Sequence, residues 1–264
     1  MDVPVPLCPG SILAPFGLDV PPYGETPFEE LVSRYREALA SLPPGPVLLR
    51  DASAMAEMRA FALAAQEAGR PFSVALTCDE EGVSPAEVDA LAALIVLEGM
   101  GVSAFGLCCK GEIAQEQLGR LVPYASMELF WLEGETVHPF PYQLIPHDPD
   151  VIPCSGDKHA RFITPDVDVG EAIECSPDLL EDILRAEDAP VGALKIVILE
   201  PDDLDIFAEQ QYAVQDALCL WSDVPELLEG ALRLYQGRAF YDGTGELEPE
   251  FLASMSQKYG LVVL

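Results

Sequence analysis

Basic residues are scarce in this sequence. Lys and Arg number 14 against 45 Asp and Glu, which gives a formal net charge of −31 at pH 7. A surface of this charge repels phosphate backbones and anionic lipid head groups. The composition therefore argues against nucleic-acid and membrane partners, and acidic residues spread along a chain are typical of a solvated surface.

Long hydrophobic runs are also lacking. No apolar run approaches the ~20 residues of a membrane-spanning helix. The first residues, MDVPVPLCPG, lack the basic segment and apolar core of a signal peptide. We therefore expect a cytoplasmic protein. The seven cysteines are odd in number and have no framework spacing, so reduced thiols are expected rather than disulfides.

Common catalytic motifs are absent as well. No serine or cysteine lies in a nucleophile-elbow pattern, and no dinucleotide-binding fingerprint is present. The glycines around Gly243 are too few for a phosphate loop and indicate a turn after Asp242. Half of the residues are hydrophobic, however, so the chain has the composition of a globular protein with a sizeable core.

The sequence does contain a regular alternation of short apolar runs and helical segments. Such alternation is typical of β-α-β units and a parallel sheet. It begins with apolar runs at Val47–Arg50, Phe72–Thr77, Ala104–Cys109 and Glu128–Leu132. It resumes in the second half, where we expect strands at Leu194–Leu199, Ala217–Trp221, Ala239–Tyr241 and Leu261–Leu264.

The predicted fold class is α/β. Eight strands with seven helices between them, and a helix at Pro27–Ser41 before the first strand, match a (β/α)8 barrel that is offset or incomplete. Residues 133–176 are proline-rich, contain all three histidines and are expected to be an irregular insertion. Residues 1–264 would then form a single barrel-like domain. The alternative is two half-sheets, at 1–132 and 177–264, joined by a connector at 133–176.

Polar and reactive residues follow the predicted strands. In parallel α/β folds the carboxyl ends of the strands face the site, so we expect any chemistry there. Asp51, the run Thr77-Cys78-Asp79, the pair Cys108-Cys109 and Glu133 occupy these positions in the first half, and Glu200, Asp223 and Asp242 do so in the second. Acidic residues at a site would suit a ligand with an ammonium or sulfonium group.

Four segments resemble consecutive strands of the homocysteine S-methyltransferase family, which includes the homocysteine-binding module of cobalamin-dependent methionine synthase. They are LLRDAS, PFSVALTCDEEG, LEGMGVSAFGLCC and LVPYASMEL, and the most specific element is Gly106-Leu107-Cys108-Cys109. The resemblance implies a zinc-dependent barrel that transfers a methyl group to the thiol of homocysteine in methionine biosynthesis. It leaves the methyl donor open.

The resemblance also assigns residues. Cys109 falls on the family's first zinc cysteine, with Cys108 beside it, and Asp51 falls on the glutamate that helps hold the amino-acid substrate. Thr77 and Cys78 would complete the binding site for the thiol substrate. The family's paired cysteines in a GGCCG segment are absent, and Cys154 and His159 are the best candidates to replace them, with Cys78 as a further candidate.

Two functions follow from these residues. The first is a zinc-dependent thiol methyltransferase, since zinc needs about three protein ligands and one open position to activate a substrate thiol. The second is a non-catalytic accessory or binding subunit that partners a corrinoid protein or methionine synthase. Under the second, Cys108 and Cys109 can be small buried apolar residues.

The net charge leads to a direct prediction about nucleic acid. Binding of the purified protein to duplex DNA at physiological salt should be undetectable, because the protein has few cations with which to neutralise phosphates. A fluorescence-anisotropy titration measures this. Salt-sensitive binding with micromolar or tighter affinity would contradict it.

Overall fold

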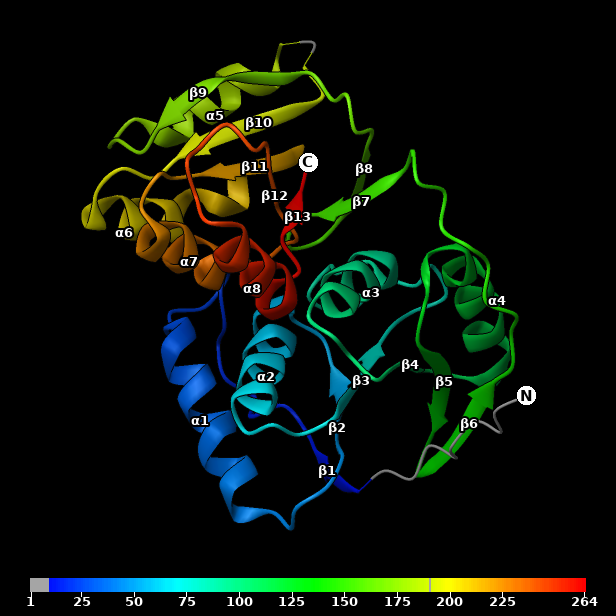
Figure 1. The fold of residues 1–264 in the computed structure, drawn as a ribbon. Helices are drawn as coiled ribbons and strands as arrows, with labels where there is room; N and C mark the ends of the chain where they lie inside the picture. Colours follow the sequence, from blue (N-terminus) through cyan, green and yellow to red (C-terminus); the bar gives the residue numbers. More distant parts are fainter. Residues whose placement is uncertain (1–9, 190) are drawn as a thin grey trace. The chain divides into compact units, whose positions relative to one another are not determined.

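The computed structural model describes residues 10–189 and 191–264, and it confirms the α/β class (Figure 1). The described chain divides into two compact units. The first unit comprises residues 10–90 and Val102–Ile145, and the second comprises Leu91–Gly101 and Pro146–Leu264. Each unit contains its own sheet.

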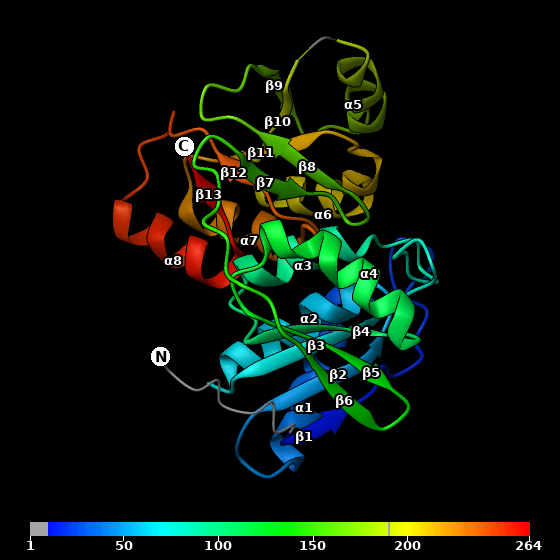
Figure 2. The same cartoon turned by 90° about the vertical axis from the view of Figure 1, so that its right-hand side faces the viewer.

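The sheet of the first unit has six strands in the order β1-β2-β3-β4-β5-β6 (Figures 1 and 2). All neighbours are parallel except β5 and β6, which form an antiparallel pair. The strands are β1 (Ser11–Leu13), β2 (Val47–Ala52), β3 (Phe72–Thr77), β4 (Ala104–Cys108), β5 (Glu128–Glu133) and β6 (Thr136–Phe140). The helices of this unit are α1 (Phe28–Ser41), α2 (Met55–Glu67) and α4 (Gly111–Leu121), with a 3-10 turn at Val122–Tyr124.

The central strands confirm the predicted parallel arrangement. β2 pairs with β3, and β3 pairs with β4, as expected for near-continuous apolar runs that are covered on both faces. One cluster of the core is formed by buried side chains from β2 to β5, namely Leu48, Ala75, Ala104, Phe130 and Leu132. These strands hold the polar residues that follow them at one edge of the sheet.

The second unit contains a five-stranded parallel sheet in the order β13-β12-β11-β10-β9. Its strands are β9 (Val169–Glu174), β10 (Ala193–Val197), β11 (Ala217–Trp221), β12 (Phe240–Tyr241) and β13 (Val262–Val263). Its helices are α3 (Ala90–Gly99, from Leu91 onward), α5 (Leu179–Glu187), α6 (Pro201–Gln210), α7 (Pro225–Leu234) and α8 (Pro249–Tyr259), with a 3-10 turn at Gln211–Ala213. An antiparallel hairpin, β7 (Ile152–Ser155) and β8 (Ala160–Ile163), precedes this sheet.

The division into two sheets differs from a closed barrel. The hydrogen bonds of the described strands form separate six-stranded and five-stranded sheets, whereas a closed barrel has one continuous sheet. The eight predicted strands are all present, four in each sheet.

The prediction for residues 133–176 was wrong in one respect. This segment is not a single irregular insertion, because it contains β6, the β7–β8 hairpin and β9. Its prolines obscured the strand pattern. Pro139 nevertheless lies in β6, which pairs antiparallel with β5, and Pro153 lies in β7, which pairs antiparallel with β8. The unit boundary at Ile145 and Pro146 lies inside the segment.

One helix begins later than the local sequence pattern indicates. Ser84 and Glu87 match a capping box, but α3 begins only at Ala90. The Ser84 hydroxyl instead accepts hydrogen bonds from the N–H groups of Ala86 and Val88, at 3.2 and 3.0 Å, and donates to the carbonyl of Ser53 at 2.7 Å. These bonds hold Ser84 in a turn, because serine side chains compete with helical hydrogen bonding.

In residues 10–189 and 191–264, no helix is both long enough and apolar enough to cross a bilayer.

The packing of β4 against β5 predicts a large effect at Gly106. A Cβ atom there would lie 2.5 Å from Cε2 of the buried Phe130 ring. Gly106→Ala should therefore lower the free energy of unfolding by about 1–3 kcal/mol through overpacking. Urea titrations in a Trp221→Phe background, which leaves Trp131 as the single tryptophan, measure this loss in the first unit.

Gly119→Ala is the matched control. Gly119 lies within α4, and a Cβ there would meet nothing within 4 Å. The change should raise stability by ~0.5–1 kcal/mol, since alanine favours a helix over glycine. Equal effects of the two substitutions would contradict the packing argument.

Candidate functional site

The candidate site lies at the carboxyl ends of β2, β4 and β5 in the first unit. A cavity of about 280 Å³ opens there. Charged, sulfur-bearing and apolar groups all contribute to its lining, which consists of Arg50, Asp51, Cys108, Cys109, Lys110, Leu132, Glu133 and Gly134. Asp51, Cys108 and Cys109, three of the residues singled out from the sequence, therefore line one concave surface.

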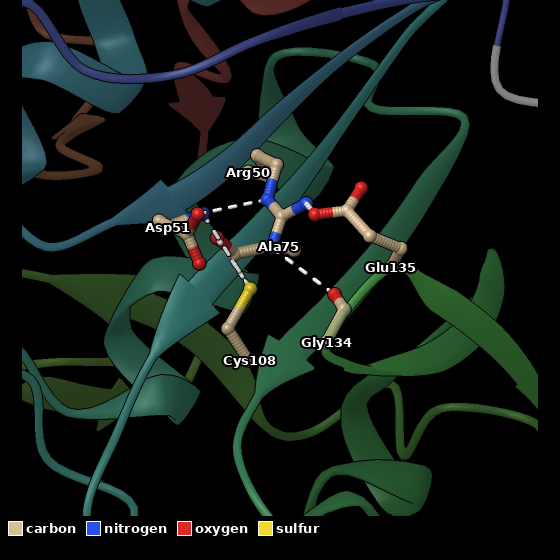
Figure 3. Close-up of polar contacts among 6 residues, drawn as sticks. All are labelled: Arg50, Asp51, Ala75, Cys108, Gly134 and Glu135. Carbon is tan, nitrogen blue, oxygen red and sulfur yellow. Dashed lines mark hydrogen bonds and ion pairs between the residues drawn. The ribbon is translucent and has the colours of Figure 1, made fainter.

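Arg50 organises one side of this cavity. Its Nε donates to Oδ2 of Asp51 at 2.8 Å, its Nη1 to Oε1 of Glu135 at 3.0 Å and its Nη2 to the carbonyl of Gly134 at 3.1 Å (Figure 3). The hydrogen bond to Asp51 is the main reason why the pKa of Arg50 is raised. Asp51 is therefore already paired, and a ligand ammonium would have to compete with Arg50 for its carboxylate.

Asp51 also has an unusual backbone. Its φ of 56° lies in the left-handed region, and the β2–β3 pairing is irregular between Leu49 and Ala52. Aspartate tolerates this region better than most residues, but the conformation still costs free energy and is enriched at functional sites. The irregularity turns the N–H of Asp51 toward Sγ of Cys108, at 3.4 Å.

Cys108 links three strands. Besides accepting from Asp51, its thiol donates to the carbonyl of Ala75 in β3 at 3.8 Å (Figure 3). Burial raises the pKa of Cys108 to about 12. The two backbone contacts give Cys108 a structural role between β2, β3 and β4.

Cys109 has a different partner. Cys78, the first residue after β3, is the group whose side chain affects it most. Interaction with the Cys78 thiol lowers the pKa of Cys109, while partial burial and the nearby Glu133 carboxylate oppose the decrease. The same interaction and burial raise the pKa of Cys78. Thr77 pairs with Cys108 across the β3–β4 ladder, which places the next residues of both strands side by side.

The proposed replacements for the missing zinc ligands belong to the second unit. Cys154 lies in β7, and its side chain is fully buried in an apolar cluster with Ile163, Cys219 and Phe240. Burial raises the pKa of Cys154 to about 12. His159 is an exposed residue of the turn that connects β7 to β8, and its backbone carbonyl accepts a hydrogen bond from Gly156.

The donor set does not fit a zinc ion. A catalytic zinc needs about three protein ligands. Among the described residues, no group of three or more His, Cys, Asp or Glu side chains is placed to hold a metal ion. Cys78 and Cys109 supply two neighbouring sulfurs, and Cys108 is held by backbone groups instead. The six cysteines of this part of the chain are free thiols, as expected, and Cys8 lies outside it.

Several strand-end acids have local structural roles. Asp79 accepts from the N–H groups of Glu81 and Val83 at 2.9 and 3.0 Å and so closes its own turn. Glu200 forms a capping box with Asp203 at the start of α6. Of the acids singled out at the strand ends, Asp51 and Glu133 line the cavity.

Sequence reasoning missed the basic residues of the site. Arg50 and Lys110 both line the cavity, although basic residues are rare in this chain. Their position directly after apolar runs was the available signal. In the second unit it also missed Lys195, whose Nζ lies 2.6 Å from Oδ2 of Asp242 and 5.4 Å from the ring centroid of Trp221.

Comparison with known proteins adds little to this geometry. The sequence matches no family model and no curated protein. Among solved structures, a C2-type ketoreductase from a modular polyketide synthase gives a TM-score of 0.23 at 12% identity, covering 90% of this chain and 53% of the ketoreductase chain. This chain thus spans about half the length of that ketoreductase, and a similarity this weak supports no argument about fold or function.

The interaction between the two thiols predicts the reactivity of Cys109. At neutral pH iodoacetamide should alkylate Cys109 before Cys108 and Cys154, since the thiolate is the reactive form. Cys78→Ala removes the donor, so the pKa of Cys109 should rise and its alkylation at pH 7 should slow several-fold. The pH dependence of the alkylation rate, followed by peptide mass spectrometry, measures the shift.

Cys78→Ser provides the control, because its hydroxyl can still donate to the Cys109 sulfur. This variant should keep most of the reactivity. If alanine and serine at position 78 have the same effect, the interaction with residue 78 does not set the pKa of Cys109.

Proposed function

We propose that this protein is a non-catalytic binding or accessory protein whose first unit binds a small amino-acid thiol such as homocysteine. The observation that carries the proposal is the cavity at the ends of β2, β4 and β5, which places charges of both signs beside Cys109. Its volume of about 280 Å³ suits a ligand of amino-acid size. The resemblance to the homocysteine S-methyltransferase family suggests the same ligand class.

The charges that remain available define how such a ligand would bind. Arg50 and Asp51 are engaged with each other, whereas neither Lys110 nor Glu133 forms an ion pair with another residue of the described chain. Lys110 would attract the ligand carboxylate and Glu133 its ammonium group. A zwitterion leaves the net charge of the cavity unchanged, which limits the desolvation cost of binding.

The accessory role is preferred because the zinc ligands are incomplete. Without a third protein donor, the described residues offer no centre that would hold and activate a substrate thiol. The partner would be a corrinoid protein or methionine synthase in the cytoplasm.

We also propose that the two sheets correspond to the halves of an offset, incomplete (β/α)8 barrel, since each follows the order of half a barrel.

Methyl transfer to a thiol is the second candidate. It is favoured by one observation, the lowered pKa of Cys109 at the end of β4. Metal analysis of the purified protein separates the candidates. Stoichiometric zinc that is lost in Cys109→Ala would support the methyltransferase, and a folded, zinc-free protein would support the binding role.

Calorimetric titration with L-homocysteine under reducing conditions tests the binding proposal. The wild-type protein should bind, and both Lys110→Ala and Glu133→Gln should weaken binding about tenfold or more, because each removes one charge-assisted contact worth ~1.5–3 kcal/mol. Lys110→Arg keeps the charge and should retain most of the affinity.

Glu116→Gln is the matched control for the acidic residue. Glu116 is exposed on α4 and does not line the cavity, so its substitution should leave the affinity unchanged. The proposal fails if homocysteine does not bind, or if all of these variants bind it as tightly as the wild type.

A further inference from the structure

Cys78 and Cys109 have the spacing of a disulfide pair. Thr77 and Cys108 are partners in the parallel β3–β4 ladder, and Cys78 and Cys109 are the residues that follow them. Neighbouring strands lie ~4.8 Å apart, within the Cα separation of about 4.4–6.8 Å that a disulfide requires. The register therefore places the two cysteines next to each other across the ladder.

The two thiols differ in access. Cys109 lines the cavity and is partly exposed, whereas the residue Cys78 is 8% exposed and is not part of the lining. A reagent that enters the cavity therefore meets Cys109 first. These are the properties of an attacking thiol and a shielded resolving thiol.

Cys108, the third cysteine of the site, takes no part in the proposed reaction. Cys108 accepts from the N–H of Asp51 and donates to the carbonyl of Ala75, on the side of β4 that faces β3 and β2. Burial keeps it protonated, with a pKa of about 12.

We propose that Cys78 and Cys109 form a redox-active dithiol, which low-molecular-weight disulfides entering the cavity oxidise to an intramolecular disulfide. This inference goes beyond the proposed function and holds whichever ligand the cavity binds. It assigns Cys109 as the attacking residue and Cys78 as the resolving residue.

The reaction balances as two thiol–disulfide exchanges. The Cys109 thiolate attacks one sulfur of the small disulfide, whose S–S bond breaks and releases the first thiolate. Cys78 then loses its proton and attacks Sγ of Cys109, which forms the Cys78–Cys109 bond and releases the second thiol. The protein dithiol loses two electrons, and the small disulfide gains them.

The test uses the full-length protein and the glutathione couple. Reduced protein is equilibrated with increasing ratios of oxidised to reduced glutathione, quenched with acid and treated with N-ethylmaleimide. Trypsin finds no Lys or Arg between Cys78 and Cys109, whereas a glutamate-specific protease can cleave after Glu98 and separate them. A disulfide-linked pair of peptides containing Cys78 and Cys109 should appear in the wild type, and it should disappear on reduction.

Three variants assign the roles. Cys78→Ser should stop the reaction at a mixed disulfide between Cys109 and glutathione, and Cys109→Ser should give neither product. Cys108→Ser should form the intramolecular disulfide as the wild type does. It also removes the ambiguity between adjacent cysteines in the mass spectra. Circular dichroism checks that each variant is folded.

The disulfide-linked peptides of the wild-type protein decide the outcome even if a variant does not fold. The proposal is overturned if excess oxidised glutathione leaves Cys78 and Cys109 reduced, or links Cys108 instead. It is also overturned if folded Cys78→Ser accumulates no mixed disulfide. Loss of homocysteine binding with an intact disulfide would contradict only the proposed function.

Discussion

The hydrogen-bond register of β2, β3 and β4 determines where each candidate side chain of the first unit lies. Because Thr77 is paired with Cys108, the residues that follow β3 and β4, Cys78 and Cys109, lie next to each other. The irregularity between Leu49 and Ala52 adds a second constraint, since it turns the N–H of Asp51 toward Cys108. A shift of one residue in either pairing would separate these groups.

Several of the few arginine side chains bind acceptor groups within the protein itself. Arg50 joins the end of β2 to the β5–β6 turn through three contacts. Arg70 donates to the carbonyls of Leu39, Pro43 and Gly45 at 3.0, 2.6 and 2.9 Å and so fastens the connection between α1 and β2. A guanidinium presents several donors in a fixed plane, which suits it to binding several acceptors at once. The chain has only 14 basic residues. Those that bind backbone carbonyls are unavailable to external phosphates.

Most of the secondary structure could be predicted from the sequence, because buried parallel strands are continuous apolar runs. Phe72–Thr77 and Ala217–Trp221 have the predicted bounds. β9 was missed because two glutamates interrupt its apolar residues and none of its residues is fully buried. α3 starts late because Ser84 binds backbone groups of its own turn. For the site, the strand ends indicated Asp51 and Cys109. They also placed Thr77 or Cys78 beside Cys109, but which of the two follows the ladder partner of Cys108 could not be predicted, since that depends on the register between two strands.

The outer strands of the first-unit sheet limit how it can associate with other chains. β1 has only three residues, and β6 contains Pro139, which has no N–H group. Proline is tolerated in a sheet where its nitrogen faces away from the ladder, so the free side of β6 lacks a donor at that position. A short strand at one end and an interrupted one at the other make poor templates for a further strand. The parallel core is thereby protected from the edge-to-edge aggregation to which exposed sheets are prone.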